Sequence, residues 1–195
     1  MTEQIVFNNL LDFHKAAENA GVKYWLCEGL LLGIYRDGGP IKGDEDDTDV
    51  GIELIGEKKR KKFILELKKR GLEPCNLGGK IRDKNCVEGR LESIQVCRDG
   101  NRIDISLVRD SGEIQYMVSK DYHLVFPGKF FSGDNTIEWK GKTFNTVNNI
   151  VDFLEYKYRN WKIPKLRGDG YQYSDRSLNR AYVTDFDINN PIIPE

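Results

Sequence analysis

One stretch of this sequence joins an acidic loop directly to an apolar run: Gly43-Asp44-Glu45-Asp46-Asp47-Thr48-Asp49-Val50-Gly51-Ile52. Five of the six residues from Asp44 to Asp49 are acidic. Like charges this close repel one another, and the start of a strand is a poor place to gather them. A bound cation would remove the conflict, whereas a solvated acidic turn is the alternative. The apolar residues that follow at once favour the cation.

The residues from position 48 to 55 predict a strand with one charged and one apolar face. Side chains alternate between the faces of a strand, so Asp47 and Asp49 share one face. The other face carries residues that suit a core: Val50, Ile52 and Leu54. Two carboxylates at positions i and i+2 can hold a hard divalent ion such as Mg²⁺. The acidic residues before Asp47 are expected to lie in the loop without binding the ion.

A third carboxylate lies in a second predicted strand, over residues 102–108. Apolar and polar side chains alternate there, with Ile103, Ile105 and Leu107 on one face and Asp104 and Ser106 on the other. An aspartate in a strand is commonly a surface residue. Flanked by isoleucines, Asp104 becomes a candidate metal ligand or general base. Three acidic groups around one or two Mg²⁺ ions are typical of phosphoryl or nucleotidyl transfer.

A glycine upstream marks a candidate phosphate-binding turn. Gly29 stands between a predicted strand over 23–27 and a predicted helix over 30–36. The N-terminus of a helix offers free N–H groups to phosphate oxygens. Arg36, further along the helix, could pair bidentately with a phosphate. The alternative interpretation is a helix cap followed by a surface arginine.

Hydrophobic periodicity predicts the remaining elements. We expect helices over 4–20, 57–70 and 148–160, and strands over 91–96, 122–126 and 136–139. Asp99-Gly100 and Lys140-Gly-Lys142 are expected to be turns. This order indicates an α+β (α/β) fold, a mixed β-sheet flanked by helices. We expect one domain over 1–165 and an irregular extension over 166–195 that packs on the domain or is partly disordered.

Composition narrows the classes of function. The chain has 195 residues and a formal net charge of −1, so we expect no nucleic-acid partner. No apolar run reaches the roughly 20 residues of a membrane span, and the N-terminus shows no secretory leader. No Cys-x-x-Cys spacing occurs among the four cysteines, Cys27, Cys75, Cys86 and Cys97. We therefore expect reduced thiols and a cytoplasmic protein.

A dense basic run, Lys58–Lys62, lies in the predicted helix over 57–70. The simplest interpretation is a solvated helix face. The functional alternative is attraction to an anionic polymer or to lipid headgroups, as a peripheral contact with a membrane surface.

The order of these parts resembles the nucleotidyltransferase superfamily, and within it the LicD family of phosphocholine and fukutin-type ribitol-phosphate transferases. The resemblance rests on Tyr24-Trp-Leu-Cys-Glu-Gly-Leu-Leu-Leu-Gly-Ile-Tyr-Arg36 and on Asp46-Asp-Thr-Asp-Val50. A later segment, Phe153-Leu-Glu-Tyr-Lys-Tyr-Arg-Asn-Trp161 with Pro164, is similar to the family's closing Leu-x-x-x-Tyr-Gly-x-Trp-x-x-Pro pattern. Together the matches frame residues 5–165.

The resemblance implies an enzyme and assigns roles to residues. The catalytic and metal-binding roles, with Mg²⁺ or Mn²⁺, fall on three carboxylates: Asp47, Asp49 and Asp104. Contact with the donor phosphates falls on three residues of the glycine segment: Gly29, Leu30 and Arg36. The implied reaction moves a phospho-alcohol, phosphocholine or a polyol phosphate, from a CDP-linked donor to a sugar hydroxyl of a glycan or glycolipid. Asp104 is the candidate base for the acceptor.

Three positions depart from the family pattern. Leu30 stands where the family usually has Thr or Ser, Ile41-Lys-Gly-Asp44 replaces Ile-Pro-Trp-Asp, and Tyr158-Arg159 replaces Tyr-Gly. The three carboxylates are kept. Two other functions stay open: a small-molecule nucleotidyltransferase that uses CTP or ATP and releases pyrophosphate, and a non-catalytic module that binds nucleotide or a partner.

Overall fold

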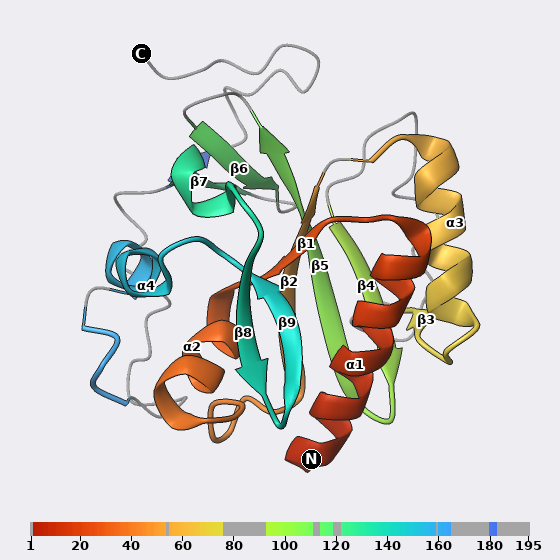
Figure 1. The fold of residues 1–195 in the computed structure, drawn as a ribbon, viewed down its shortest axis with the longest axis horizontal. Helices are drawn as coiled ribbons and strands as arrows, with labels where there is room; N and C mark the ends of the chain where they lie inside the picture. Colours follow the sequence, from red (N-terminus) through yellow and green to blue (C-terminus); the bar gives the residue numbers. More distant parts are fainter. Residues whose placement is uncertain are drawn as a thin grey trace.

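A mixed β-sheet runs through the molecule, with helices on both of its sides (Figure 1). The computed structural model describes residues 2–53, 55–75, 93–110, 114–118, 122–158, 160–164 and 180–182. Its helices are α1 (Glu3–Ala20), α2 (Glu28–Asp37), α3 (Glu57–Lys68), α4 (Ile150–Tyr158) and the short 3-10 helix η2 (Gly128–Phe131).

The strands, in chain order, are β1 (Tyr24–Leu26), β2 (Asp47–Glu53), β3 (Glu73–Pro74), β4 (Ser93–Arg98), β5 (Asn101–Asp110), β6 (Ile114–Val118), β7 (Tyr122–Pro127), β8 (Asn135–Trp139), β9 (Lys142–Thr146) and β10 (Arg180–Tyr182). They pair in the order β10-β7-β6-β5-β2-β1-β9-β8, with β4 on β5 and β3 on β4. The pairs β2–β5 and β1–β9 are parallel, and the other pairs are antiparallel.

The central pair of strands follows the alternation of the sequence. Val50 and Ile52 of β2 are fully buried, as is Ile103 of β5. In the parallel register Asp49 lies opposite Asp104, and Asp47 lies opposite Arg102. Because side chains alternate, this register places the acidic residues of both strands on the face opposite the apolar ones.

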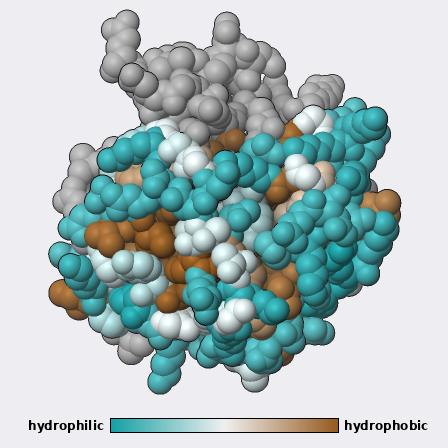
Figure 2. All heavy atoms as spheres, in the orientation of Figure 1, coloured by the Kyte–Doolittle hydropathy of each residue, from teal (hydrophilic) through white to brown (hydrophobic). Residues whose placement is uncertain are grey.

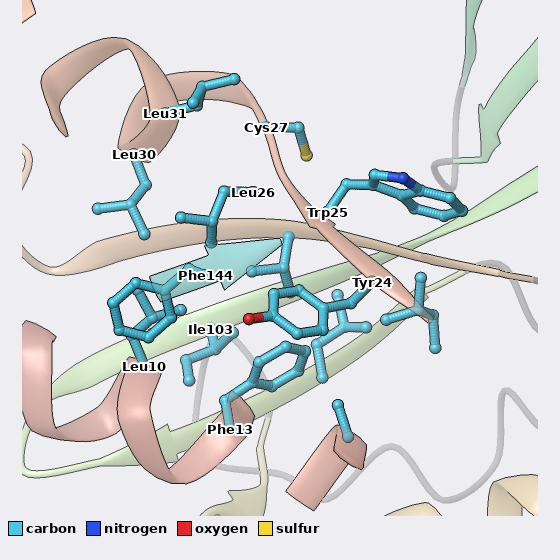
Figure 3. Close-up of a cluster of buried hydrophobic side chains, with 14 of the residues drawn as sticks. Leu10, Phe13, Tyr24, Trp25, Leu26, Cys27, Leu30, Leu31, Ile103 and Phe144 are labelled. Carbon is cyan, nitrogen blue, oxygen red and sulfur yellow. The ribbon is translucent and has the colours of Figure 1, made fainter. Parts of the chain in front are cut away.

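The apolar face of the central strands packs against α1. Phe13 of α1 meets Tyr24 edge to face, with ring centroids 5.2 Å apart, and Leu10 and Ile103 are fully buried beside them (Figure 3). Gly21 ends α1 in the left-handed conformation and donates its N–H back to the last turn. Helices α1 and α3 pack together on this side, whereas α2 and α4 lie on the other side (Figure 1).

Helix α2 packs closely against the loop that precedes β2. A Cβ at Gly33 would lie 2.8 Å from the backbone nitrogen of Ile41, so only glycine fits there. The indole of Trp139 donates to the Gly38 carbonyl at 3.0 Å and fixes the start of the same loop. The acidic loop is therefore held against α2 before it enters β2.

The structure confirms the predicted fold class, a mixed sheet flanked by helices. It corrects the start of α2, which begins at Glu28 instead of after Gly29; Glu28 itself has a positive φ of 57°. It also differs over the extension expected to be irregular, where Arg180–Tyr182 form β10 on β7. The rest of that extension, residues 166–179 and 183–195, lies outside the described residues.

The expectation of reduced thiols is wrong for two of the four cysteines. Cys75 and Cys97 form a disulfide, with their Cα atoms 5.8 Å apart. The antiparallel pairing of β3 with β4 brings the two residues near each other, because Cys75 directly follows β3 and its backbone N–H donates to the carbonyl of Gln95 in β4 at 2.9 Å. Cys27 is a free, buried thiol, and Cys86 lies outside the described residues.

The basic run Lys58–Lys62 lies on α3, on the opposite side of the sheet from α2. Most of its side chains are exposed, and the surface over α3 is mainly hydrophilic (Figure 2). Lys59 pairs with Glu53 and Lys61 with Glu57, so part of the positive charge is balanced locally. Contact with a membrane surface stays a prediction. Across the described residues, no helix has the length and apolar character needed to cross a bilayer.

Candidate functional site

The three predicted carboxylates meet on one face of the sheet. Asp47 and Asp49 come from β2, and Asp104 comes from the adjacent parallel strand β5. One carboxylate oxygen from each lies within 4.8 Å of the others. All three side chains are partly buried. We call these three residues the acidic triad.

A buried polar network fixes the chain where it enters the triad. Asn101 donates to the Thr48 hydroxyl at 3.1 Å and accepts from the Asn9 amide at 3.1 Å. The backbone N–H of Arg102 donates to the Asp46 carbonyl at 2.9 Å. These bonds tie the start of β2 to the start of β5, and they set the register that brings the carboxylates together.

Burial and neighbouring negative charges raise the pKa values of two of the three carboxylates, Asp49 and Asp104. The pKa of Asp49 is raised well above its usual range, first by burial and then by the charges of Glu28 and Asp47. The pKa of Asp104 is raised to about 6, again first by burial and then by Asp47. The ionised forms of Asp49 and Asp104 are therefore destabilised, and a nearby positive charge would stabilise them.

Arg102 supplies one such cation from within the triad. Its Nη2 lies 2.7 Å from Asp47 Oδ2, and its Nε lies 3.0 Å from Asp104 Oδ1. The guanidinium therefore bridges two of the three carboxylates. The sequence reasoning missed this residue, although its position two residues before Asp104 placed it on the same face of β5.

A second cation reaches the site from α4. Lys157 forms an ion pair with Glu28, the first residue of α2, and both side chains are largely buried. The two charges also act on the pKa of Asp49: Glu28 raises it and Lys157 lowers it. Lys157 lies within the closing sequence segment, but nothing in its own spacing indicated a role at the triad.

The glycine segment faces the triad with its backbone. A Cβ at Gly29 would lie 3.6 Å from Asp49 Oδ2 and 3.8 Å from Asp44 Oδ2. Asp44, predicted only to decorate the loop, therefore lies beside the site. Leu30 is 2% exposed and turns its side chain into the core (Figure 3), so it can offer a ligand only its backbone.

Arg36 lies at the far end of α2. Its guanidinium bonds both carboxylate oxygens of Asp37, and its Nη1 donates to the Trp161 carbonyl at 3.0 Å. At 1.5 Å per residue, roughly 10 Å of helix separates it from Gly29. The bond to Trp161 fastens the closing segment to α2, and the contact of Arg36 with a donor phosphate stays a prediction.

The donor set of the triad fits a divalent metal ion. Carboxylate oxygens are the hard ligands that Mg²⁺ prefers, and Mn²⁺ accepts the same set. The three carboxylates are crowded and partly buried, and an ion would offset the burial and repulsion that raise the pKa values of Asp49 and Asp104. The residues present therefore suit Mg²⁺ or Mn²⁺.

The part of the chain that holds this site matches a known protein family. A family model described as the LicD/FKTN/FKRP nucleotidyltransferase domain matches residues 21–149, which include the glycine segment and the whole acidic triad. The mouse (Mus musculus) protein named ribitol-5-phosphate transferase FKTN is 29% identical over 160 residues. That match covers 77% of this chain and 32% of the relative, so the chain spans about a third of the relative's length.

Among solved structures, one similar chain is the antibiotic-resistance factor ANT(2'')-Ia, determined in solution. The match has a TM-score of 0.47 and 11% identity, and it covers 75% of this chain and 66% of the other. The family match, in contrast, extends over more than half of the chain and contains the site. The chain therefore belongs to the LicD/FKTN/FKRP nucleotidyltransferase-domain family.

Proposed function

We propose that this chain is a metal-dependent transferase that moves a phospho-alcohol from a CDP-linked donor to a sugar hydroxyl of a glycan or glycolipid. The acidic triad carries the proposal, because it gathers three hard ligands from two adjacent strands. Family membership and the name of the mouse relative support a transferase of phosphorus-containing groups. Whether the alcohol is choline or a polyol is a question for the donor panel below.

The proposed roles follow from the position of each residue. Asp47, Asp49 and Asp104 would hold Mg²⁺ or Mn²⁺, which when bound neutralises charge on the donor phosphates and on the leaving CMP. Asp104, which is partly buried at the triad, is also the proposed group that takes the proton of the acceptor hydroxyl.

Gly29 is proposed to keep the donor site open. Because it has no side chain, the first turn of α2 presents backbone N–H groups beside Asp49. Leu30 would add only its own backbone to this turn. A side chain at position 29 would fill the space between the helix and the triad, where the phosphates of the donor are proposed to lie.

Product analysis by mass spectrometry tests the proposal. The full chain is incubated with Mg²⁺, glycan acceptors and a panel of CDP-choline, CDP-ribitol, CDP-glycerol, CTP and ATP. We expect CMP and a phospho-alcohol-modified glycan from one CDP-alcohol. Asp47→Asn should lose this activity by at least 100-fold, because it removes a charged metal ligand.

Asp46→Asn is the matched control, since it removes the same charge from the exposed residue just before β2. It should keep activity close to that of the wild type. Release of pyrophosphate from CTP or ATP would contradict the proposal and favour nucleotidyl transfer. Equal turnover by Asp47→Asn and the wild type would place the chemistry elsewhere.

A further inference from the structure

Arg102 occupies an unusual position for an arginine, inside a cluster of carboxylates. It lies opposite Asp47 in the parallel register and two residues before Asp104 on β5. Its Nη2 and Nε contact these two carboxylates at 2.7 and 3.0 Å, and its side chain is only 24% exposed. An arginine whose purpose was solubility would extend into water; this one turns toward the site.

The charged side chains at the triad, together with the Glu28–Lys157 pair, carry a net negative charge. Glu28, Lys157, Arg102 and the three aspartates form four carboxylates and two cations, a formal charge of −2. One divalent ion brings the formal charge of these six groups to zero, so a second ion would meet no net negative charge from them. Without Arg102 the same groups would carry −3 and would attract divalent ions more strongly.

The guanidinium suits a permanent role of this kind. It stays charged at every physiological pH, and its planar fork matches carboxylate oxygens on two sides. Asp47 and Asp104 lie on different strands, so the bridge also holds β2 and β5 together at the site. A lysine would retain the charge but not the two-sided geometry.

We propose that Arg102 is the resident counter-cation of the acidic triad, a positioning residue that holds Asp47 and Asp104 in place for one divalent ion and competes with that ion for them. The inference rests on the metal-dependent function proposed above. In this proposal Arg102 stabilises the site when no metal is bound, and it lowers the affinity of the site for the metal ion.

Mn²⁺ binding to the full chain, followed by electron paramagnetic resonance of the free ion, tests the competition. We expect one Mn²⁺ per wild-type chain. Arg102→Gln should bind Mn²⁺ at least tenfold more tightly, because a fixed positive charge next to the ion is gone. Arg102→Lys keeps the charge and should stay within about threefold of the wild type.

Arg70→Gln is the matched control. Arg70 lies just after α3, has a similar exposure of 19%, and pairs with Glu66 at 2.8 Å, away from the triad. Its replacement should leave Mn²⁺ affinity unchanged. An affinity of Arg102→Gln equal to or weaker than that of the wild type would overturn the inference and leave the metal-dependent function standing.

Urea unfolding in EDTA tests the holding role without metal. Arg102→Gln should lower the urea midpoint, and the loss should shrink in an Asp47→Asn background because the partner charge is already gone. Additive losses in the double variant would overturn the inference. If neither the wild type nor any variant bound Mn²⁺, both the proposed metal-dependent function and the inference about Arg102 would be wrong. If Arg102→Gln bound Mn²⁺ with the affinity of the wild type, only the inference about Arg102 would be wrong.

Discussion

Because Asp104 is buried in the triad, it makes the stability of the folded chain depend on pH. Its pKa in the folded chain is about 6, above the ordinary value of 3.8, chiefly because of burial and then because of Asp47. Between these two values the folded chain binds a proton that the unfolded chain has released. The contribution of Asp104 to stability is therefore greatest below pH 4 and is lost as the pH rises to about 6.

Asp104→Asn should remove this pH dependence. In EDTA, we expect the free energy of unfolding of the variant to gain on that of the wild type from pH 4 to pH 6, by up to roughly 3 kcal/mol, and then to stay level. Urea unfolding at pH 4, 5, 6 and 7 measures the difference. Asp46→Asn, at an exposed position, is the control and should show no such gain. A difference that stays flat across this range would contradict the assignment.

At the scale of single residues, the sequence predicted the acids better than their partners. Strand alternation placed Asp47, Asp49 and Asp104 on matching faces, and the structure brings them together. The same alternation placed Arg102 on that face. It was not considered, because a positively charged side chain cannot bind a metal ion and so does not belong to the pattern of a metal site. Asp44 was assigned to the loop because only the fold brings Gly29 beside it.

At the scale of elements, one buried ion pair joins α2 to α4. Glu28 begins α2, and Lys157 lies in the last turn of α4, so their contact connects the glycine segment with the closing segment. The exposed fractions of the two side chains are 14% and 5%. A buried charge that loses its partner is expensive, so the pair fixes where α4 lies against the site.

Lys157→Met should therefore destabilise the chain by about 3–5 kcal/mol, since it leaves Glu28 buried and unpaired next to Asp49. The double variant Glu28→Gln/Lys157→Met should lose less than the single variant. Thermal and urea unfolding measure both. Lys162→Met, at an exposed lysine just beyond α4, is the control and should change stability by less than about 0.5 kcal/mol. A loss of under about 1 kcal/mol for Lys157→Met would contradict this role.

The elements themselves were largely predictable from periodicity. The helices over 4–20 and 57–70 appear as α1 and α3 with ends shifted by one or two residues. The start of α2 was predicted two residues late, because Gly29 was taken as the break and Glu28 adopts the positive φ instead. The two-residue strand β3 is too short to leave a hydrophobic pattern.

At the scale of the whole molecule, a disulfide joins β3 to β4 near the edge of the sheet. Cys75 and Cys97 are 22 residues apart, so the bond closes a substantial loop of chain. A cross-link of this kind stabilises mainly by limiting the unfolded chain. It also holds β3 against β4, the strand that pairs with β5, which carries Asp104 and Arg102.

Cys97→Ser should lower the free energy of unfolding by roughly 3 kcal/mol, the loss expected for a loop of this length. Reductant should bring the wild type down to the stability of the variant and leave the variant unchanged. Urea unfolding with and without dithiothreitol measures both effects. A wild type that does not respond to reductant would contradict a stabilising bond.

The strand order was the least predictable feature of the molecule. Periodicity identifies a strand but not its neighbour, and the parallel pairing of β2 with β5 joins segments about fifty residues apart in the chain. That pairing creates the site, because it brings Asp104 opposite Asp49. The disulfide escaped prediction for the same reason: cysteine spacing alone does not show which strands become adjacent.

The most direct test of the metal site is a crystal structure of the chain with Mn²⁺ and CDP, using the anomalous signal of manganese. We expect one peak bound by oxygens of Asp47, Asp49 and Asp104, with the diphosphate of CDP on the same ion beside Gly29. Manganese bound away from the triad, with CDP present and no peak among the three carboxylates, would contradict the proposed function.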